Sequence, residues 1–307
     1  MNLKGRDYIT LADFTTEELW YLLELARELK EKQKKGIGHK LLDGKTLGMI
    51  FQKASTRTRV SFEAAMYHLG GLGMFLSKND LQIGRGEPIE DTARVLSRYC
   101  DGILIRTFQH QEVLDLAKYA DVPVINGLSD DFHPTQALAD MLTIWEHKGT
   151  LAGIKLAYVG DGNNVAHSLI LAAALLDLEI VIASPEGYKP NPQIVESAKK
   201  IARDPSQIKV IIDPKEAVRG AQVLYTDVWA SMGQEEEAKI RRAAFSDYQI
   251  NEELLKSADD NAIVMHCLPA HRGEEISPDV MEGPRSVVFD EAENRLHAHK
   301  AILAALL

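Results

Sequence analysis

Residues 46–69 read TLGMIFQKASTRTRVSFEAAMYHL and set the pattern for the rest of the chain. The first six residues form a short apolar run, which is typical of a buried strand. A polar loop follows, and residues 57–69 then space their apolar side chains as a helix does, up to the glycine pair Gly70-Gly71. The stretch therefore predicts a strand, a loop and a helix in succession.

The same succession recurs along the whole chain. Residues 15–35 have helical spacing behind a capping-box pattern of Thr15 and Glu18. Strands that alternate with helices form parallel sheets covered by helices, so we predict an α/β protein. Further strands are predicted at residues 102–105, 122–126, 155–159, 179–183, 223–226 and 262–266, and further helices at residues 111–119, 165–176 and 191–203.

The predicted architecture is two doubly wound parallel-sheet domains joined by interdomain helices. A chain of 307 residues is long enough for two domains of ordinary size. A helical stretch at residues 135–149 precedes the second run of strands, so we place the domains at residues 1–148 and 149–290. The helical pattern of residues 291–307 is expected to pack back on the first domain.

Composition argues against several classes of function. Hydrophobic residues make up 45% of the chain and charged residues 26%, which is typical of a globular protein. The net charge of −10 argues against general binding to nucleic acid or to an anionic membrane. The N-terminal residues 1–16 lack the apolar core of a secretory signal, and the apolar C-terminus is far shorter than the ~20 residues that span a bilayer.

Cysteine usage favours a reducing compartment. The chain has two cysteines, Cys100 and Cys267, which is too few for a disulfide framework. No cysteine–histidine cluster has the spacing of a structural zinc site. We therefore expect a cytoplasmic protein, and we assign no metal ligands.

The loop between the first strand and its helix predicts a phosphate site. Ser55, Thr56 and Thr58 supply hydroxyl donors, and Arg57 can bind two phosphate oxygens at once. The start of a helix adds unpaired N–H groups and the positive end of its dipole. An ordinary Ser/Thr helix cap beside solvated arginines remains an equally good interpretation of these residues alone.

Two further positions favour an anion site. Arg106 follows a predicted strand, at the carboxyl end where open α/β sheets bind ligands, although a surface arginine has the same pattern. His133 precedes a predicted helix whose first turn contains Pro134, and Gln136 follows three positions later. A lone histidine at such a place is usually a cap or a polar residue of the core.

Taken together, these motifs resemble the aspartate/ornithine carbamoyltransferase family. The resemblance covers essentially the whole chain, and although each motif is weakly specific, six of them in family order are highly specific. The matching residues are 55–59 (STRTR) with 61–63 (SFE), 106–107 (RT), 133–140 (HPTQALAD), 160–166 (GDGNNVA), 227–233 (DVWASMG) and 266–273 (HCLPAHRG).

The resemblance implies that the first domain binds carbamoyl phosphate and the second binds the amine acceptor. It implies that Ser55 to Thr58 hold the phosphate and that Arg106, His133 and Gln136 hold the carbamoyl group. Gln82 and Arg295 resemble family positions that reach carbamoyl phosphate, although locally both look like surface residues. The segment around Gln82 lies at a subunit boundary in the family, so a homotrimer, or a multiple of trimers, with shared sites is implied. The remaining carbamoyl-phosphate contacts implied are Pro134, Thr135, Cys267 and Leu268.

The acceptor is predicted from charge. Ornithine carries a cationic side chain and calls for an acid, whereas aspartate would call for an additional arginine or lysine. Asp227 follows a predicted strand at its carboxyl end, although aspartate also favours turns there. Cys267 stands where the aspartate branch usually has proline, although an isolated cysteine is more often a small buried hydrophobe. Both residues therefore favour the ornithine branch.

Three more residues complete the predicted acceptor site. Asn164, at a predicted helix start, offers an amide to the amino-acid end of ornithine, although a simple N-cap has the same pattern. Ser231 and Met232 belong to a stretch that resembles the acceptor loop of the ornithine branch. The implied partners are thus carbamoyl phosphate and L-ornithine, with L-citrulline and phosphate as products.

The implied reaction needs neither metal nor organic cofactor. The amine must be neutral to attack, yet its pKa is near that of lysine, about 10.4. Asp227 is expected to fix the amine by a hydrogen bond, with Cys267 nearby. Arg106, His133 and Thr58 are expected to stabilise the oxyanion, each contributing ~3 kcal/mol. Arginine synthesis and citrulline breakdown are both open as cellular roles.

Three other functions remain to be weighed. Residues 159–166 resemble a dinucleotide fingerprint, which would indicate a nicotinamide-dependent dehydrogenase, but the next strand runs into Ser184-Pro185 and lacks the expected acid at its end. A paralogue that only binds would tend to lose groups of the reacting site, and none is missing. The third is a carbamoyltransferase whose acceptor is an acylated ornithine or putrescine. The sequence alone separates these acceptors from ornithine less well.

Overall fold

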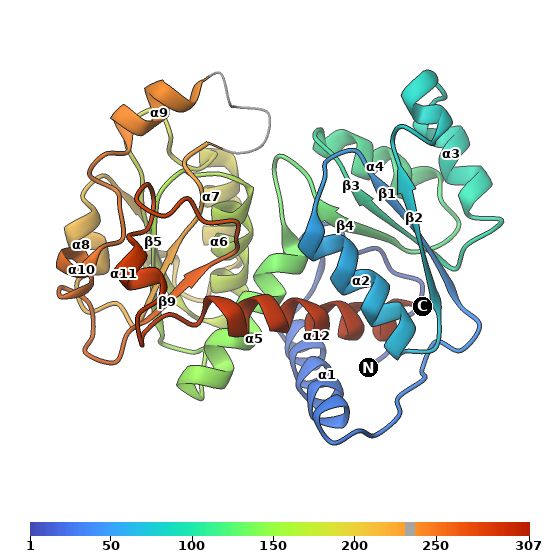
Figure 1. Cartoon of the computed structure of the whole chain (residues 1–307), viewed down its shortest axis with the longest axis horizontal. Coiled ribbons are helices and arrows are strands. Elements are labelled where there is room, and N and C mark those ends of the chain that lie inside the picture. Colours follow the sequence, from blue (N-terminus) through green and yellow to red (C-terminus); the bar gives the residue numbers. More distant parts are fainter. Residues whose placement is uncertain (231–236) are drawn as a thin grey trace. The chain divides into compact units, whose positions relative to one another are not determined.

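The computed structural model describes residues 1–230 and 237–307 (Figure 1). Its contacts divide the chain into two compact units, the first of Met1–Leu142 with Glu293–Leu307 and the second of Thr143–Ala292. Each unit is built on one parallel sheet, which confirms the predicted fold class. Two helices, α5 (Pro134–Lys148) and α12 (Val288–Leu306), continue from one unit into the other.

The first unit holds a four-stranded sheet in the order β2-β1-β3-β4. All its neighbouring strands are parallel. Its strands are β1 (Thr46–Phe51), β2 (Leu72–Ser77), β3 (Gly102–Arg106) and β4 (Val124–Leu128), and its further helices are η1 (Leu11–Asp13), α1 (Thr16–Lys34), α2 (Thr56–His68), η2 (Gln82–Arg85), α3 (Ile89–Leu96) and α4 (His110–Tyr119).

The second unit holds a five-stranded sheet in the order β7-β6-β5-β8-β9. It is also parallel throughout. Its strands are β5 (Lys155–Val159), β6 (Glu179–Ala183), β7 (Ile208–Ile211), β8 (Val223–Thr226) and β9 (Ile263–His266), and its further helices are α6 (Asn164–Leu176), α7 (Pro192–Ile201), η3 (Pro205–Gln207), α8 (Pro214–Val218), α9 (Ala238–Ala244), α10 (Glu252–Leu255) and α11 (Pro278–Met281).

Strand order reverses once in each sheet. In the first sheet the chain passes from β1 outward to β2 and then returns to the other side of β1 with β3. In the second it passes from β5 through β6 to β7 and returns to the other side of β5 with β8. At such a reversal the loops after the two central strands diverge, and the crevice outside their carboxyl ends is where open α/β sheets bind ligands.

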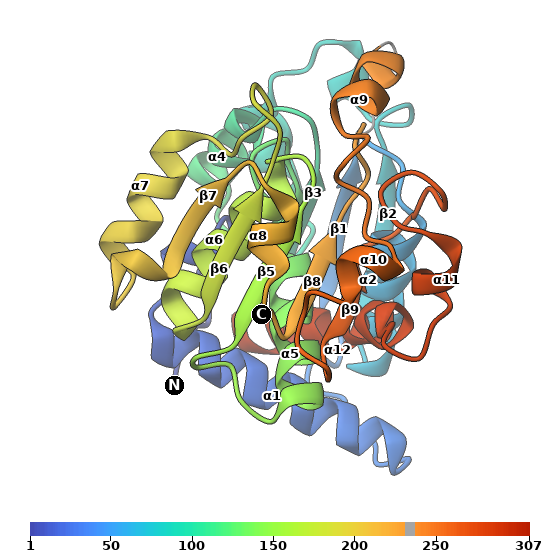
Figure 2. The same ribbon diagram turned by 90° about the vertical axis from the view of Figure 1, so that its left-hand side faces the viewer.

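The second sheet is covered on both faces because its strands are apolar on both faces. Ala157 and Val159 of β5 pack in a core cluster with Ala217 and Val218 of α8. The alternate residue Tyr158 is also fully buried, on the opposite side of the strand. Figure 1 accordingly shows α8 and α6 on opposite sides of β5, and Figure 2 looks onto the side that α8 covers.

Most of the predicted elements are present. The capping box of Thr15 and Glu18 is confirmed at the start of α1. The strands predicted at residues 46–51, 155–159, 179–183 and 223–226 have the predicted bounds. In the described parts of the chain no helix is both long and apolar enough to cross a membrane.

The sequence analysis missed β2 and β7, which lie at the edges of their sheets. These two edge strands are covered less completely than the other two, β4 and β9, whose residues are all buried: β2 has an exposed and five partly exposed residues, and β7 contains Lys209. The last helix also begins at Val288, three residues before the predicted start.

Candidate active site

In the first unit, the predicted anion-binding residues meet at the reversal of strand order. The loop that carries Ser55 follows β1, and Arg106 is the last residue of β3. Phe51 and Arg106 are register partners, so the two strands end at the same level. Arg106 is buried, and its interpretation as a surface arginine is therefore wrong.

The start of α2 combines a helix cap with unpaired donors. Ser55 is the N-cap residue, and its Oγ accepts a hydrogen bond of 3.1 Å from the N–H of Thr58. Among the described residues, no group accepts a hydrogen bond from the N–H groups of Thr56 and Arg57, and no carboxylate pairs with the half-buried Arg57 guanidinium. A helix start with exposed N–H groups and an adjacent guanidinium is suited to an anion.

Arg295 lies beside this helix start, and its expected exposure is wrong. Only 2% of the residue is exposed, and it is the eighth residue of α12. Its guanidinium donates to Gln136 Oε1 at 2.5 Å and to Thr58 Oγ1 at 3.0 Å. Arg295 thereby joins the predicted phosphate residue Thr58 to the predicted carbamoyl residue Gln136.

His133 lies among cations and is held neutral. Burial, together with the positive charges of Arg295, Arg106 and Arg57, lowers the pKa of His133 well below its ordinary value. A neutral imidazole has one N–H donor and one acceptor nitrogen. His133 therefore suits the donation of a hydrogen bond to an oxyanion without gaining a charge.

Two neighbours of His133 occupy the first turn of α5. Pro134 is its first residue, where the missing N–H costs no helical hydrogen bond. Thr135 follows and is fully buried. Within residues 1–230 and 237–307 its Oγ1 has no hydrogen-bond partner. A buried hydroxyl without a partner is costly, so this oxygen is suited to a ligand.

Gln82 lies apart from these contacts. It is exposed and begins η2. In the described chain its hydrogen bonds are those of its carbonyl oxygen, with the N–H groups of Gly86 and Glu87. Among the described residues, no hydrogen bond joins Gln82 to the other predicted residues.

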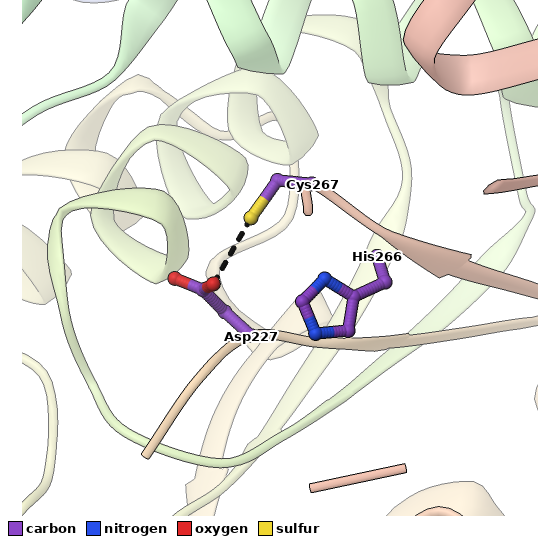
Figure 3. Close-up of side chains that lie close together, drawn as sticks. All are labelled: Asp227, His266 and Cys267. Atoms are coloured by element: carbon purple, nitrogen blue, oxygen red, sulfur yellow. Dashed lines mark hydrogen bonds between the residues drawn. The ribbon is translucent and has the colours of Figure 1, made fainter. Parts of the chain in front are cut away.

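In the second unit, Asp227 and Cys267 meet at the ends of adjacent strands. Thr226 and His266 are register partners, and the two site residues follow them directly. Cys267 Sγ lies 3.0 Å from Asp227 Oδ1. Figure 3 shows the two side chains pointing toward each other. The predicted proximity of the two side chains is confirmed, and both are buried.

Asn163 donates a hydrogen bond to the other carboxylate oxygen of Asp227. The sequence analysis gave Asn163 no role. Its Nδ2 donates to Asp227 Oδ2 at 2.8 Å, while its Oδ1 accepts from the N–H groups of Val165 and Ala166 at 3.0 and 3.2 Å. Asn163 is therefore the N-cap of α6, and Asn164 is the first helical residue rather than the cap. An asparagine directly before a helix start was the available signal.

Three predicted residues of the second unit remain, Leu268, Ser231 and Met232. Leu268 is half-buried with a φ of 57°, and its N–H donates to His266 Nδ1 at 2.9 Å. Ser231 and Met232 lie outside the described residues.

Asp227, His266 and Cys267 have the residue types of a metal site, with ligand atoms within 4.8 Å of one another. His266 Nδ1 accepts from Leu268, and its Nε2 bonds Glu275 Oε1 at 2.9 Å. Both ring nitrogens are engaged, so a metal ion here would have to displace a hydrogen bond.

The glycine-rich turn after β5 is unsuited to a dinucleotide. A Cβ on Gly162 would lie 2.1 Å from the backbone nitrogen of Pro190, so the space beside this glycine is already filled. Asn163 also occupies the N–H groups at the start of α6 that would bind a pyrophosphate. Both observations argue against the dehydrogenase interpretation.

Comparison with known proteins covers nearly the whole chain. Residues 6–146 match the model of the aspartate/ornithine carbamoyltransferase carbamoyl-P binding domain, and residues 152–306 match that of the Asp/Orn binding domain. The chain belongs to the aspartate/ornithine carbamoyltransferase family.

Relatives within this carbamoyltransferase family are similar over their full length. The ornithine carbamoyltransferase of Pyrococcus abyssi is 59% identical, over 100% of this chain and 97% of its own. That of Anoxybacillus flavithermus is 58% identical, over 100% and 98%. The solved structure of ornithine carbamoyltransferase from Pyrococcus furiosus superposes with a TM-score of 0.97 at 57% identity, covering 100% of this chain and 98% of that one.

Because Asn163 both caps α6 and donates to Asp227, its substitution should affect stability and carbamoyltransferase activity to different extents. Asn163→Ala removes both a helix cap and a donor to Asp227, so we expect a loss of about 1 kcal/mol in the free energy of unfolding together with a large fall in turnover. Asn191→Ala, which removes only the cap of α7, is the matched control. Denaturant unfolding and turnover are measured for both variants; equal turnover in the two would contradict the role of Asn163.

Proposed function

We propose that this chain transfers the carbamoyl group of carbamoyl phosphate to the side-chain amine of L-ornithine, giving L-citrulline and phosphate. The family and the relatives named ornithine carbamoyltransferase support this activity. The observation that carries the choice of acceptor is the buried carboxylate of Asp227, flanked by the thiol of Cys267 and the amide of Asn163.

In this proposal each domain binds one of the two substrates. Residues 1–148, with the C-terminal helix 291–307, bind carbamoyl phosphate, and residues 149–290 bind ornithine. The descriptions of the two matching family models support this division. So does the grouping of Glu293–Leu307 with the first unit by its contacts.

The phosphate lies at the start of α2. Its oxygens accept hydrogen bonds from the N–H groups and hydroxyls of Ser55 to Thr58 and from Arg57, with Arg295 as a second cation and Gln82 as a further contact. The carbamoyl group is held by the residues at the end of β3 and the start of α5, and it contacts Cys267 and Leu268. Those residues are Arg106, His133, Pro134, Thr135 and Gln136.

The contacts of the Thr58 hydroxyl leave its hydrogen available to the substrate. Its Oγ1 already accepts a hydrogen bond from Arg295. The hydroxyl hydrogen therefore remains to be donated, and it suits an oxygen of the substrate.

Ornithine is recognised by charge. Its side-chain amine lies between Asp227 and Cys267, and its amino-acid end contacts Asn164, Ser231 and Met232. Aspartate would need a free cation instead. Arg241 is the one buried arginine or lysine in the described part of the second unit, and it is already paired with Asp161 at 3.0 Å.

The reaction is a direct attack of the neutral amine on the carbonyl carbon. Asp227 accepts a hydrogen bond from the amine and so fixes it for attack. Arg106, His133 and Thr58 donate to the oxygen on which negative charge develops. The carbonyl re-forms as the carbon–oxygen bond to phosphate breaks, and the attacking nitrogen gives one of its protons to the departing phosphate. Arg57 and the start of α2 balance the charge of this leaving group. Such a transfer requires no metal or organic cofactor.

We also propose a cytoplasmic homotrimer, or a multiple of trimers, that serves arginine synthesis. The relatives named anabolic in Pyrococcus furiosus and Campylobacter jejuni support the biosynthetic role. A second copy of the chain would cover apolar side chains of the first unit. Tyr67 of α2 is 79% exposed, and Leu72 of the adjacent edge strand β2 is 57% exposed.

The test of the activity is a citrulline assay with four acceptors. With carbamoyl phosphate present, we expect turnover with ornithine and little with N-acetylornithine, putrescine or aspartate, because only ornithine carries both a free amino-acid end and a side-chain amine. A preference for aspartate would contradict the role of Asp227. A preference for N-acetylornithine would identify a modified substrate.

The phosphate site is tested by two arginines of one motif. Arg57→Ala should lower turnover at least about a hundredfold with little loss of stability, because it removes a donor to the leaving phosphate. Arg59→Ala is the matched control, since Arg59 is exposed and instead pairs with Glu63 at 3.1 Å. Near-normal turnover of Arg57→Ala would show that the phosphate binds elsewhere.

The trimer is tested by light scattering. We expect three times the mass of one chain, and a lower mass for Tyr67→Glu because a buried charge weakens an apolar interface. Ile240→Glu replaces a similarly exposed side chain of the second unit and should leave the mass unchanged. A wild-type monomer at micromolar concentration would refute the assembly.

A further inference from the structure

His299 is a buried histidine of α12 for which the reaction as derived has no use. It lies one helical turn after Arg295 and is fully buried. Its Nε2 is 3.3 Å from Arg295 Nε, and its Nδ1 is 2.9 Å from Ser61 Oγ of α2. The ring also stacks on Phe62, with centroids 3.8 Å apart.

Only one arrangement of hydrogens satisfies these contacts. A guanidinium can only donate, so His299 Nε2 must be the acceptor and its hydrogen must be on Nδ1. Nδ1 then donates to Ser61 Oγ, and the Ser61 hydroxyl in turn donates to the carbonyl of Arg57 at 2.5 Å. Burial and the charge of Arg295 lower the pKa of His299 well below its ordinary value, which agrees with a neutral ring.

The contacts of His299 fix the plane of the Arg295 guanidinium. The other two edges of that group donate to Gln136 and Thr58. The Nε contact to His299 restrains the guanidinium from a third side. Through His299 and Ser61 it also connects Arg295 to the first turn of α2. The same turn carries Arg57, whose carbonyl ends the chain of hydrogen bonds.

We propose that His299 is a positioning residue for the phosphate site, holding Arg295 in register with the start of α2. This inference rests on the proposed function, in which Arg295 and the start of α2 bind the phosphate of carbamoyl phosphate. The alternative role for His299 is core packing on Phe62. Both roles predict some loss of stability on substitution, but only the positioning role predicts a selective loss of affinity for phosphate.

The test compares three variants by steady-state kinetics, with inorganic phosphate as a competitive inhibitor against carbamoyl phosphate. His299→Leu keeps an apolar side chain but removes both hydrogen bonds. We expect the inhibition constant of phosphate and the KM for carbamoyl phosphate to rise about tenfold, since hydrogen bonds to charged groups are among the stronger ones. The KM for ornithine should stay within about twofold because the second unit binds the acceptor.

Two matched variants separate positioning from packing. His299→Gln supplies an acceptor oxygen and a donor nitrogen on one side chain and should restore most of the phosphate affinity. His297→Leu changes a second buried histidine of α12, one that contacts Glu293 instead of Arg295, and should leave the phosphate inhibition constant unchanged.

An unchanged phosphate inhibition constant in His299→Leu overturns the proposal, as does an equal rise in His297→Leu. If His299→Leu does not fold, Ser61→Ala is measured in the same way, with an expected rise of about threefold. No rise in that variant also overturns the proposal. Calorimetric titration with phosphate keeps the two hypotheses apart. Phosphate binding by a wild type that forms no citrulline removes the proposed function, and the positioning role is then decided by titrating the variants, with a weaker phosphate affinity expected in His299→Leu and not in His297→Leu.

Discussion

The reversal of strand order in each parallel sheet is the constraint on which the rest of the molecule depends. Because neighbouring strands on the two sides of the reversal end at the same level, the loops that follow them open away from each other and leave room outside the sheet. In the first unit the loop after β1 leads to the start of α2, and Arg106 ends β3; in the second the two loops carry Asn163 and Asp227. Backbone topology therefore brings these residues to the carboxyl ends of the central strands of each sheet.

The carboxyl ends of the two sheets differ in the charge of their side chains. The first unit gathers Arg57, Arg106 and Arg295 around a histidine whose pKa is held low by burial and by these arginines. The second unit presents the carboxylate of Asp227 and sequesters its buried arginine, Arg241, in an ion pair with Asp161. Gathered arginines and a buried carboxylate are each costly without a ligand of opposite charge, so the first unit favours an anion and the second favours a cation.

The sequence analysis predicted most central elements, and three of its errors about buried polar residues share one cause. It placed Arg295 on the surface and gave Asn163 and His299 no role. Each of these residues acts through a partner distant in sequence: Arg295 through Thr58 and Gln136, Asn163 through Asp227, His299 through Ser61. Local patterns carry no information about such partners. The edge strands β2 and β7 were missed because strands covered less completely lose the apolar run.

Hydrophobic periodicity and local turn chemistry were enough to establish the α/β class, the helix cap at Thr15 and the loops that carry Ser55 and Asp227. These features depend on residues a few positions apart, so a linear reading finds them. Tertiary structure alone decided that Arg295 is buried against Thr58, that Cys267 lies 3.0 Å from Asp227, and that Pro190 fills the space beside Gly162. Those facts depend on segments that come together only when the sheets form, because the free energy of burying them is gained from packing between distant parts of the chain.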